Sequence, residues 1–424
     1  MEETTGRIMP PNETAPGKIV AFLICLVVVI LRRPDAVWMP QFWAEDGVVF
    51  WVAAFRDGFR ASFFQNYAGY LHTIPRLAAG AAAFFPSRYS PAFYNGFAIL
   101  LASISIWLFY LPPARSLIKS DWLRLLLCVL FISAHPGIET VNNLTNLHWY
   151  TSVGVLVLLC TPIRGWRWSL PAALFILLAT TSSAAPILYV PIALTFLVGR
   201  KADHYAASLA LVIGTCIQIA AHALSRSTTS FINADSRDRV LAISFDRLCT
   251  SLLAVFPGFE TARWLNKYLY GLNVAVACVF FGTVVLTLHR RHLLMLVGSS
   301  YLLIALSIIP VLTRGSADMS SLTFFPPGFV FDSRYLLLPF AIVLFLAGKA
   351  LEELYESGRI SLRIFYAALL AGFLVVACSR PDTRPFRNLS WSEYADLLDA
   401  GKITGAPIQP ITQDRHWWID LRRK

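Results

Sequence analysis

The sequence contains few charged residues. Asp, Glu, Lys and Arg make up only 14% of its 424 residues, whereas an ordinary soluble domain carries roughly 25%. Hydrophobic residues make up 56%, and the mean hydropathy is +0.59. A helical bundle in lipid tolerates this composition because the bilayer solvates its apolar exterior. The sequence therefore predicts an all-α polytopic membrane protein.

Motifs of several common protein classes are also absent. The sequence has no P-loop, no Rossmann glycine pattern and no DxD motif of the kind found in soluble nucleotide-sugar enzymes. Its 7 cysteines include no CxxC or His-Cys spacing, so neither a zinc site nor a disulfide framework is indicated. The net charge of +11 is spread over short loops, which predicts orientation in a membrane and no nucleic-acid partner.

What the sequence does contain is a series of apolar runs. A straight span needs roughly 20 residues, so the shorter runs must extend into their flanks, and the series predicts about eleven transmembrane helices. The runs cover residues 18–31, 93–111, 122–135, 149–162, 169–182, 185–198, 205–223, 268–288, 293–312, 335–349 and 362–378.

Basic residues between these runs predict the orientation of the chain. A cytoplasmic N-terminus places the basic residues of five loops in the cytoplasm, as the positive-inside rule expects. Arg32 and Arg33 are the exception. Leu71 to Phe85 is interpreted as an interfacial or re-entrant helix, because a full span there would invert every later loop. The cytoplasmic set is Arg115, Lys119, Arg124, Arg164, Arg167, Arg200, Lys201, Arg290, Arg291, Lys349, Arg359 and Arg363.

This orientation divides the chain into two parts. Residues 1–378 are expected to form the membrane domain, with a first extracytoplasmic loop at 32–92. Residues 379–424 are expected to form a small extracytoplasmic tail with one helix near 390–400. The layout is typical of a protein of the bacterial inner membrane, with a periplasmic C-terminal tail.

The first extracytoplasmic loop carries an aromatic pattern. Trp51, Phe55, Phe59 and Phe63 recur every four residues, which is the spacing of one helical face. The pattern predicts an amphipathic helix that lies flat on the membrane.

Glu45 and Asp46 stand side by side before that pattern. A carboxylate moved into hydrocarbon costs roughly 2.5 to 3.5 kcal/mol. One interpretation is helix capping, in which an acid satisfies free backbone amides, although one acid would suffice. The other interpretation is a catalytic pair, and we favour it because ionisable residues of membrane proteins commonly mark functional sites.

Placed after a span and before an amphipathic segment, the two acids resemble the first-loop motif of the C-type (GT-C) membrane glycosyltransferases. A second segment, Asp332 to Pro339, resembles the Arg-Tyr-x-x-x-Pro element of the lipid-sugar-dependent members of that superfamily. The general layout of most of the chain is also similar, but the specific motifs are these two short segments. The resemblance implies that Glu45 or Asp46 supplies the catalytic carboxylate and that Arg334, with Tyr335, binds the lipid phosphate of the donor.

The reaction implied by the resemblance is an inverting sugar transfer from a polyprenyl-phosphate donor to a cell-envelope glycan or glycolipid. One acid would take the proton of the acceptor hydroxyl, and Asp46 is preferred because members with a single acid often keep Asp. The absence of nucleotide-sugar motifs favours a lipid-linked donor. His72 and Arg76 lie one helical turn apart, so they could line the donor cavity or anchor the segment at the interface.

The loop at 135–148 is rich in neutral hydrogen-bonding groups, which are the groups that bind sugars. An ordinary turn-rich surface loop explains it equally well. His135 and Glu139 are candidate ligands for a divalent cation, Mg or Mn, which some members of the superfamily use, but their spacing specifies no site. The candidate sugar-binding or acceptor-binding residues are Asn142, Asn143, Asn146, His148 and Trp149.

The sequence leaves two other functions open. A transporter or flippase for a lipid-linked sugar should show internal repeats and broken helices at the midplane, and the sequence shows neither clearly. A non-catalytic membrane scaffold would retain the fold, and its two acids would be dispensable.

Overall fold

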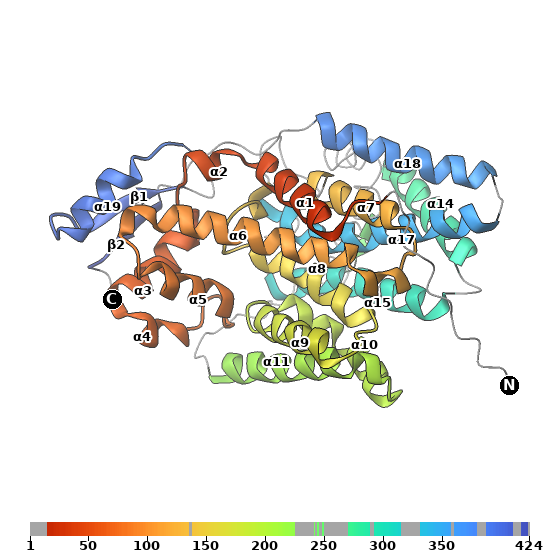
Figure 1. Ribbon diagram of the computed structural model, residues 1–424, viewed down its shortest axis with the longest axis horizontal. Helices are drawn as coiled ribbons and strands as arrows, with labels where there is room; N and C mark the ends of the chain where they lie inside the picture. Colours follow the sequence, from red (N-terminus) through yellow and green to blue (C-terminus); the bar gives the residue numbers. More distant parts are fainter. Residues whose placement is uncertain are drawn as a thin grey trace.

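The computed structural model describes residues 15–134, 138–224, 270–288, 292–314, 331–357, 360–379, 387–409 and 417–422, with five positions between 241 and 249. The chain is mostly helical, and each of the predicted apolar runs contains a helix (Figure 1). These helices are α1 (Lys18–Arg32), α6 (Ser90–Trp107), α7 (Asp121–Ala134), α8 (Leu147–Cys160), α9 (Trp166–Thr180), α10 (Val190–Val198), α11 (Tyr205–Leu224), α14 (Tyr270–Leu288), α15 (Leu293–Arg314), α17 (Leu337–Ser357) and α18 (Ile360–Ser379).

Three helical stretches of the described chain have the length and apolar character needed to cross a membrane, namely Ser87–Tyr110, Ala202–Leu224 and Arg334–Glu356. They indicate a membrane protein. Several other apolar helices are too short for a straight span, since a helix such as α8, with 14 residues, is only about 21 Å long against a hydrocarbon core of roughly 30 Å. Eleven crossings therefore remain a prediction.

Short elements fill the segment between α1 and α6. The predicted amphipathic helix through Trp51 and Phe63 is wrong in one respect, because Gly58 has a φ of +78° and divides it. Trp51 stacks on Phe55 and Phe59 packs on Phe63, so two short aromatic pairs replace one continuous face. The elements are α2 (Asp35–Trp38), the π-helix η1 (Asp46–Trp51), α3 (Val52–Asp57), α4 (Phe59–Phe63), α5 (Thr73–Ala82) and the 3-10 helix η2 (Ser87–Tyr89).

The C-terminal tail contains the helix expected near 390–400, as α19 (Trp391–Asp399), followed by an antiparallel pair of strands, β1 (Gly405–Ile408) and β2 (Trp417–Asp420). Figure 1 shows α19, β1 and β2 at the same end of the molecule as α2 to α5. The remaining 3-10 helices are η3 (Leu108–Tyr110), η4 (Pro112–Ser116), η5 (Ile138–Thr140), η6 (Ala185–Tyr189), η7 (Ala202–His204) and η8 (Phe331–Leu336).

Helix α17 is the most enclosed of the three long apolar stretches, since 83% of its apolar window is buried. It packs against α7, α8, α14, α15 and α18. Gly348 permits the close approach to α7, because a Cβ there would meet the side chain of Leu127. The η8 turn precedes α17, so this helix leads directly from Arg334 into the core.

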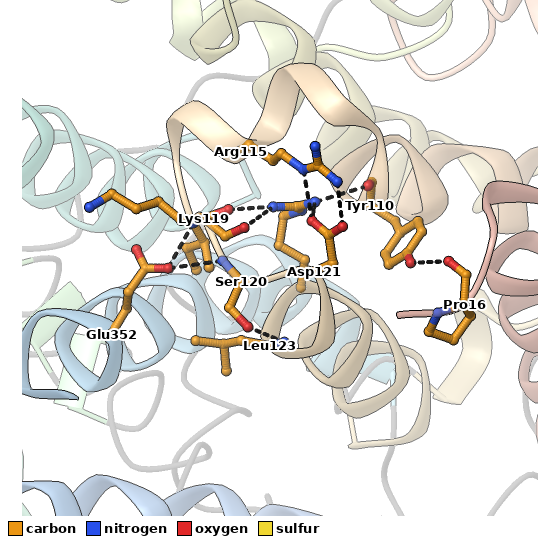
Figure 2. A network of polar contacts seen from close by, with 10 residues as sticks. Pro16, Tyr110, Arg115, Lys119, Ser120, Asp121, Leu123 and Glu352 are labelled. Carbon is orange, nitrogen blue, oxygen red and sulfur yellow. Dashed lines mark hydrogen bonds and ion pairs between the residues drawn. The ribbon is translucent and has the colours of Figure 1, made fainter. Parts of the chain in front are cut away.

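A polar network fixes the start of α7 against the last turns of α17 (Figure 2). Glu352 accepts hydrogen bonds from the amides of Lys119 (2.7 Å) and Ser120 (3.1 Å). Ser120 in turn caps α7, since its hydroxyl accepts the amide of Leu123 at 3.2 Å. Asp121 pairs with Arg115 and with the fully buried Arg124. Some of the loop cations that predicted orientation therefore also hold helices together.

Candidate functional site

The site is built around Asp46, the first residue of the π-helix η1. The amide of Asp46 donates to the Trp43 carbonyl at 2.8 Å, which turns the chain at the acid pair. Its side chain is fully buried. One carboxylate oxygen accepts the Leu144 amide at 2.9 Å, and the other accepts the amide and the hydroxyl of Thr145 at 2.7 and 2.6 Å. A first-loop acid is thus bound to a loop about one hundred residues later.

Burial raises the pKa of the Asp46 carboxyl from 3.8 to about 7, although the hydrogen bonds from Thr145 and Leu144 act in the opposite direction. The neighbouring charge of Glu45 raises the pKa further. Desolvation outweighs the hydrogen bonds because the carboxylate has lost its water entirely. A carboxyl group that titrates near neutrality suits a general base at physiological pH.

The loop that receives Asp46, residues 138–146 and here called the asparagine loop, is held by its own amide side chains. Asn142 has a φ of 57°, a conformation that Asn tolerates, and donates to the carbonyls of Val29 and Arg33 at 3.3 and 3.1 Å. Asn143 donates to the Glu139 carbonyl at 2.7 Å and accepts the amide of Asn146 at 3.0 Å. All three Asn side chains are buried.

These bonds change the expected role of the three asparagines. Their amide donors, predicted to bind sugar, are already engaged with backbone carbonyls and with each other. The geometry supports a structural role for Asn142, Asn143 and Asn146, which is to hold the amides of Leu144 and Thr145 toward Asp46. Thr145 could not be recognised from the sequence, because a hydroxyl in a loop of many polar residues gives no distinguishing signal.

Arg33 explains the exception to the positive-inside rule. Its side chain is only 2% exposed and donates to the Val141 carbonyl at 2.9 Å. The guanidinium also lies 5.3 Å from the centre of the Trp43 ring, a cation–π geometry. Arg33 therefore ties the asparagine loop to the acid segment, residues 42–51, and is not a solvated loop cation.

His148 and Trp149 link the asparagine loop to the start of α17. The His148 ring nitrogen Nδ1 is 2.8 Å from the Thr145 carbonyl oxygen, and its ring centre is 4.9 Å from that of Trp149. The Trp149 ring packs edge-to-face against Tyr335 at 5.3 Å. The structure thus brings the two predicted sugar-contacting rings next to the Arg334–Tyr335 element.

Two acidic residues interact with Arg334. Its Nε lies 3.4 Å from a carboxylate oxygen of Glu139, and its guanidinium lies 5.2 Å from the centre of the Tyr335 ring. The charge of Glu45, which is half-buried, also reaches Arg334. The acid pair and the Arg-Tyr element, from distant parts of the sequence, are therefore joined through the asparagine loop and the start of α8.

Arg76 completes the site from α5, with a side chain only 2% exposed. Its Nη2 donates to the Gln65 carbonyl at 3.3 Å, and its guanidinium lies 5.0 Å from the centre of the Phe50 ring. Within the described part of the chain, its Nε and Nη1 are buried and have no hydrogen-bond partner. Burial lowers the pKa of Arg76 to about 10, so the group is still charged at neutral pH.

His72 lies between Arg76 and the aromatic residues of the site. It stacks on Tyr70 at 4.2 Å and packs against Phe50 at 5.2 Å. Burial, with the charges of His148 and Arg76, lowers its pKa to about 3. His72 is therefore neutral at physiological pH and serves as a neutral hydrogen-bonding group.

Glu139 is one of the two residues proposed to bind a divalent cation. Glu139 faces the guanidinium of Arg334, which already supplies a positive charge there. His135 lies outside the described residues. Across the part of the chain that the structure describes, no group of three or more His, Cys, Asp or Glu side chains could hold a metal ion.

Together, these features define a helical membrane protein with an acid-and-arginine site at one end of its bundle. No protein-family model, curated protein or solved structure matches the chain.

Proposed function

We propose that this protein is an inverting membrane glycosyltransferase of the GT-C type, which transfers a sugar from a polyprenyl-phosphate donor to a cell-envelope glycan or glycolipid. The observation that carries the proposal is the meeting of three distant segments. The acid pair at 45–46, the asparagine loop with His148 and Trp149, and the Arg334–Tyr335 element share one set of contacts.

Asp46 is the proposed general base. It takes the proton from an acceptor hydroxyl, whose oxygen forms a bond to the anomeric carbon as the bond from that carbon to the phosphate oxygen breaks. Both oxygens of Asp46 already accept hydrogen bonds from Leu144 and Thr145. Oδ2 accepts the Leu144 amide and keeps a lone pair that can accept the hydroxyl proton. The side chain is fully buried, so catalysis requires the segments that cover it to move. Glu45, which is half-buried, is the second acid of the pair.

Arg76 is the better supported phosphate ligand of the two arginines. Glu139 partly neutralises Arg334, whereas two N–H groups of Arg76 are buried without a partner among the described residues. An unsatisfied buried donor costs about 1–3 kcal/mol, and a phosphate oxygen would recover that cost with a charge-assisted hydrogen bond. Arg334 would then keep Glu139 and Tyr335 in position beside the acid pair.

The membrane setting belongs to the same proposal. About eleven crossings and a cytoplasmic N-terminus would place the site and the C-terminal tail on the periplasmic face of a bacterial inner membrane. There the site could accept a lipid-linked donor directly from the bilayer.

The test is transfer from a polyprenyl-phosphate sugar to membrane-extracted glycolipid by the purified protein. We would compare wild type with Glu45→Gln, Asp46→Asn and the double variant, and use Glu393→Gln on the exposed face of α19 as the matched control. Loss of the base should reduce kcat by roughly a hundredfold or more, and the control should retain wild-type kcat.

The outcomes separate the alternatives. A folded Asp46→Asn variant without transfer supports Asp46 as the base, and loss only in Glu45→Gln assigns that role to Glu45. Full activity in the double variant removes the proposal. Absence of transfer by wild type with every donor in a complete polyprenyl-phosphate sugar pool would favour a lipid-linked sugar transporter or a scaffold.

A further inference from the structure

The C-terminal tail reaches the acid segment through the backbone of Gln409. Its amide donates to the Phe42 carbonyl at 3.2 Å, and its carbonyl accepts the Ala44 amide at 3.1 Å. These two bonds form a parallel bridge around Trp43. The Trp43 carbonyl accepts the amide of Asp46, so the bridge holds the residue from which the acid turn begins.

The side chain of Gln409 fixes the strand that makes this bridge. It is 5% exposed. Its Oε1 accepts the amide of Arg387 at 3.1 Å, and its Nε2 donates to the Arg387 carbonyl. Gln409 therefore joins the segment that leads into α19 to the end of β1, and both to the acid segment.

Apolar side chains also pack between the C-terminal tail and the acid segment. A Cβ on Gly47, the residue after Asp46, would lie 3.1 Å from the Ile408 side chain, so glycine permits the close approach of β1. On α19, Trp391 packs edge-to-face on Phe42 at 4.7 Å and on Trp51 at 5.3 Å. These rings flank the acid pair on both sides in the sequence.

We propose that Gln409 is a positioning residue for Asp46, and that the tail is therefore part of the catalytic apparatus and not an accessory cap. The tail holds the backbone of the acid segment from one side, while the amides of Leu144 and Thr145 hold the carboxylate from the other. Asp46 needs both supports because a short turn alone leaves its side chain free to rotate toward water. This inference rests on the proposed function in so far as it concerns catalysis.

Two variants test the bridge, with a control in the same tail. Gln409→Ala removes both side-chain bonds to Arg387, and Gly47→Ala pushes against Ile408. Lys402→Ala changes an exposed side chain of the tail and is the control. The first measurement needs no substrate and follows the melting temperature of the detergent-purified protein from pH 5 to pH 9. Glu45 is the titratable group whose charge acts on Asp46, the charge of Asp46 in turn acts on Tyr94, and neither residue is changed.

A looser acid segment admits water to Asp46, so its pKa should fall toward the ordinary value. We expect the pH at which the melting temperature declines to shift down by about one unit in Gln409→Ala and Gly47→Ala, and to stay unchanged in Lys402→Ala. Gln409→Glu keeps the acceptor for the Arg387 amide, so its pH midpoint should lie between those of wild type and Gln409→Ala. An unchanged pH midpoint in both test variants overturns the inference.

The second measurement is transfer by the same variants. We expect kcat to fall about tenfold to a hundredfold with KM within twofold, because a small misplacement of a catalytic group slows chemistry more than binding. A shifted pH midpoint with no transfer by wild type would preserve the positioning role and defeat the proposed function. A pH midpoint unchanged in both test variants, together with transfer by wild type, would defeat the positioning role and preserve the proposed function.

Discussion

Asp46 combines complete burial with three hydrogen bonds, and its raised pKa links protein stability to pH. A carboxyl whose pKa is higher in the folded than in the unfolded state contributes most to stability below its ordinary pKa, near 3.8, and loses that contribution as the pH rises through about 7. We therefore expect the free energy of unfolding to decline by a few kcal/mol, to order of magnitude, between about pH 4 and pH 7.

Asp46→Asn should remove most of this decline, since an amide does not titrate. The free energy of unfolding, measured in detergent at a series of pH values, checks this prediction, with Glu393→Gln as an exposed-acid control. An equally steep decline in Asp46→Asn would show that other groups cause the pH dependence. The two proteins are compared by the slope of the free energy of unfolding against pH, because Asp46→Asn also loses an acceptor for the Thr145 donors at every pH.

At this scale the sequence was informative where the chemistry of a residue conflicts with its surroundings. Adjacent acids and an arginine in apolar sequence stand out: the charge of Glu45 acts on Arg334, and Asp46 is bound to the loop whose Glu139 pairs with Arg334. The amides of Asn142 and Asn143 could serve a sugar or a backbone equally well, and only the positions of Val29 and Glu139 decide. Those partners could not be read from the sequence.

The ion pair between η5 and η8 makes a prediction about two elements. Arg334→Gln leaves Glu139, which is 5% exposed at its side chain, without its guanidinium. Breaking such a pair from one side should cost about 3 kcal/mol. Adding Glu139→Gln removes the stranded charge and should restore about half of that loss. Chemical denaturation of wild type, the single variants Arg334→Gln and Glu139→Gln and the double variant measures the coupling, and strictly additive losses would contradict it.

Helices α4 and α5 make a second prediction at the same scale. A Cβ on Gly80 would collide with the ring of Phe59, so Gly80→Ala must displace that ring or separate the two helices. We expect a loss of roughly 1–3 kcal/mol, as for other overpacked contacts. Gly96→Ala on α6 is the control, because nothing lies within 4 Å of a Cβ there. Equal melting temperatures for the two variants would show that α4 moves aside at no cost.

The helices themselves were predictable because apolar runs of this length have few alternatives in lipid. The interruption at Gly58 was not, although the glycine is visible in the sequence. An aromatic residue every fourth position indicates one helical face only if the backbone stays helical throughout. Glycine can adopt a positive φ, which removes that condition.

For the whole molecule, the predicted orientation places Trp38 and Arg200 on opposite sides of the membrane. Both are exposed, Trp38 at the site end on α2 and Arg200 in the turn after α10. In a background without native cysteines, Trp38→Cys should react with a membrane-impermeant maleimide added from the periplasm. Arg200→Cys should react only after permeabilisation of the inner membrane. Labelling of both from one side would overturn the orientation.

At this scale the sequence could not anticipate contacts between distant segments. The bridge from Gln409 to Phe42 and Ala44 is made by backbone atoms, which carry no sequence signal. The Glu352 contact to the start of α7 is similarly remote. Patterning identifies helices and their apolar faces, whereas the partner of each helix end depends on the packing of the whole bundle.

The Gln409 bridge also has a consequence for biogenesis. During synthesis, residues 42–44 leave the ribosome long before residue 409 is translated, so the acid segment lacks its partner strand until then. A nascent chain that already contains Asp46, the asparagine loop and Arg334 would thus still lack a rigid acid turn. A chain truncated before Gln409 should therefore insert into the bilayer yet lack the proposed transferase activity.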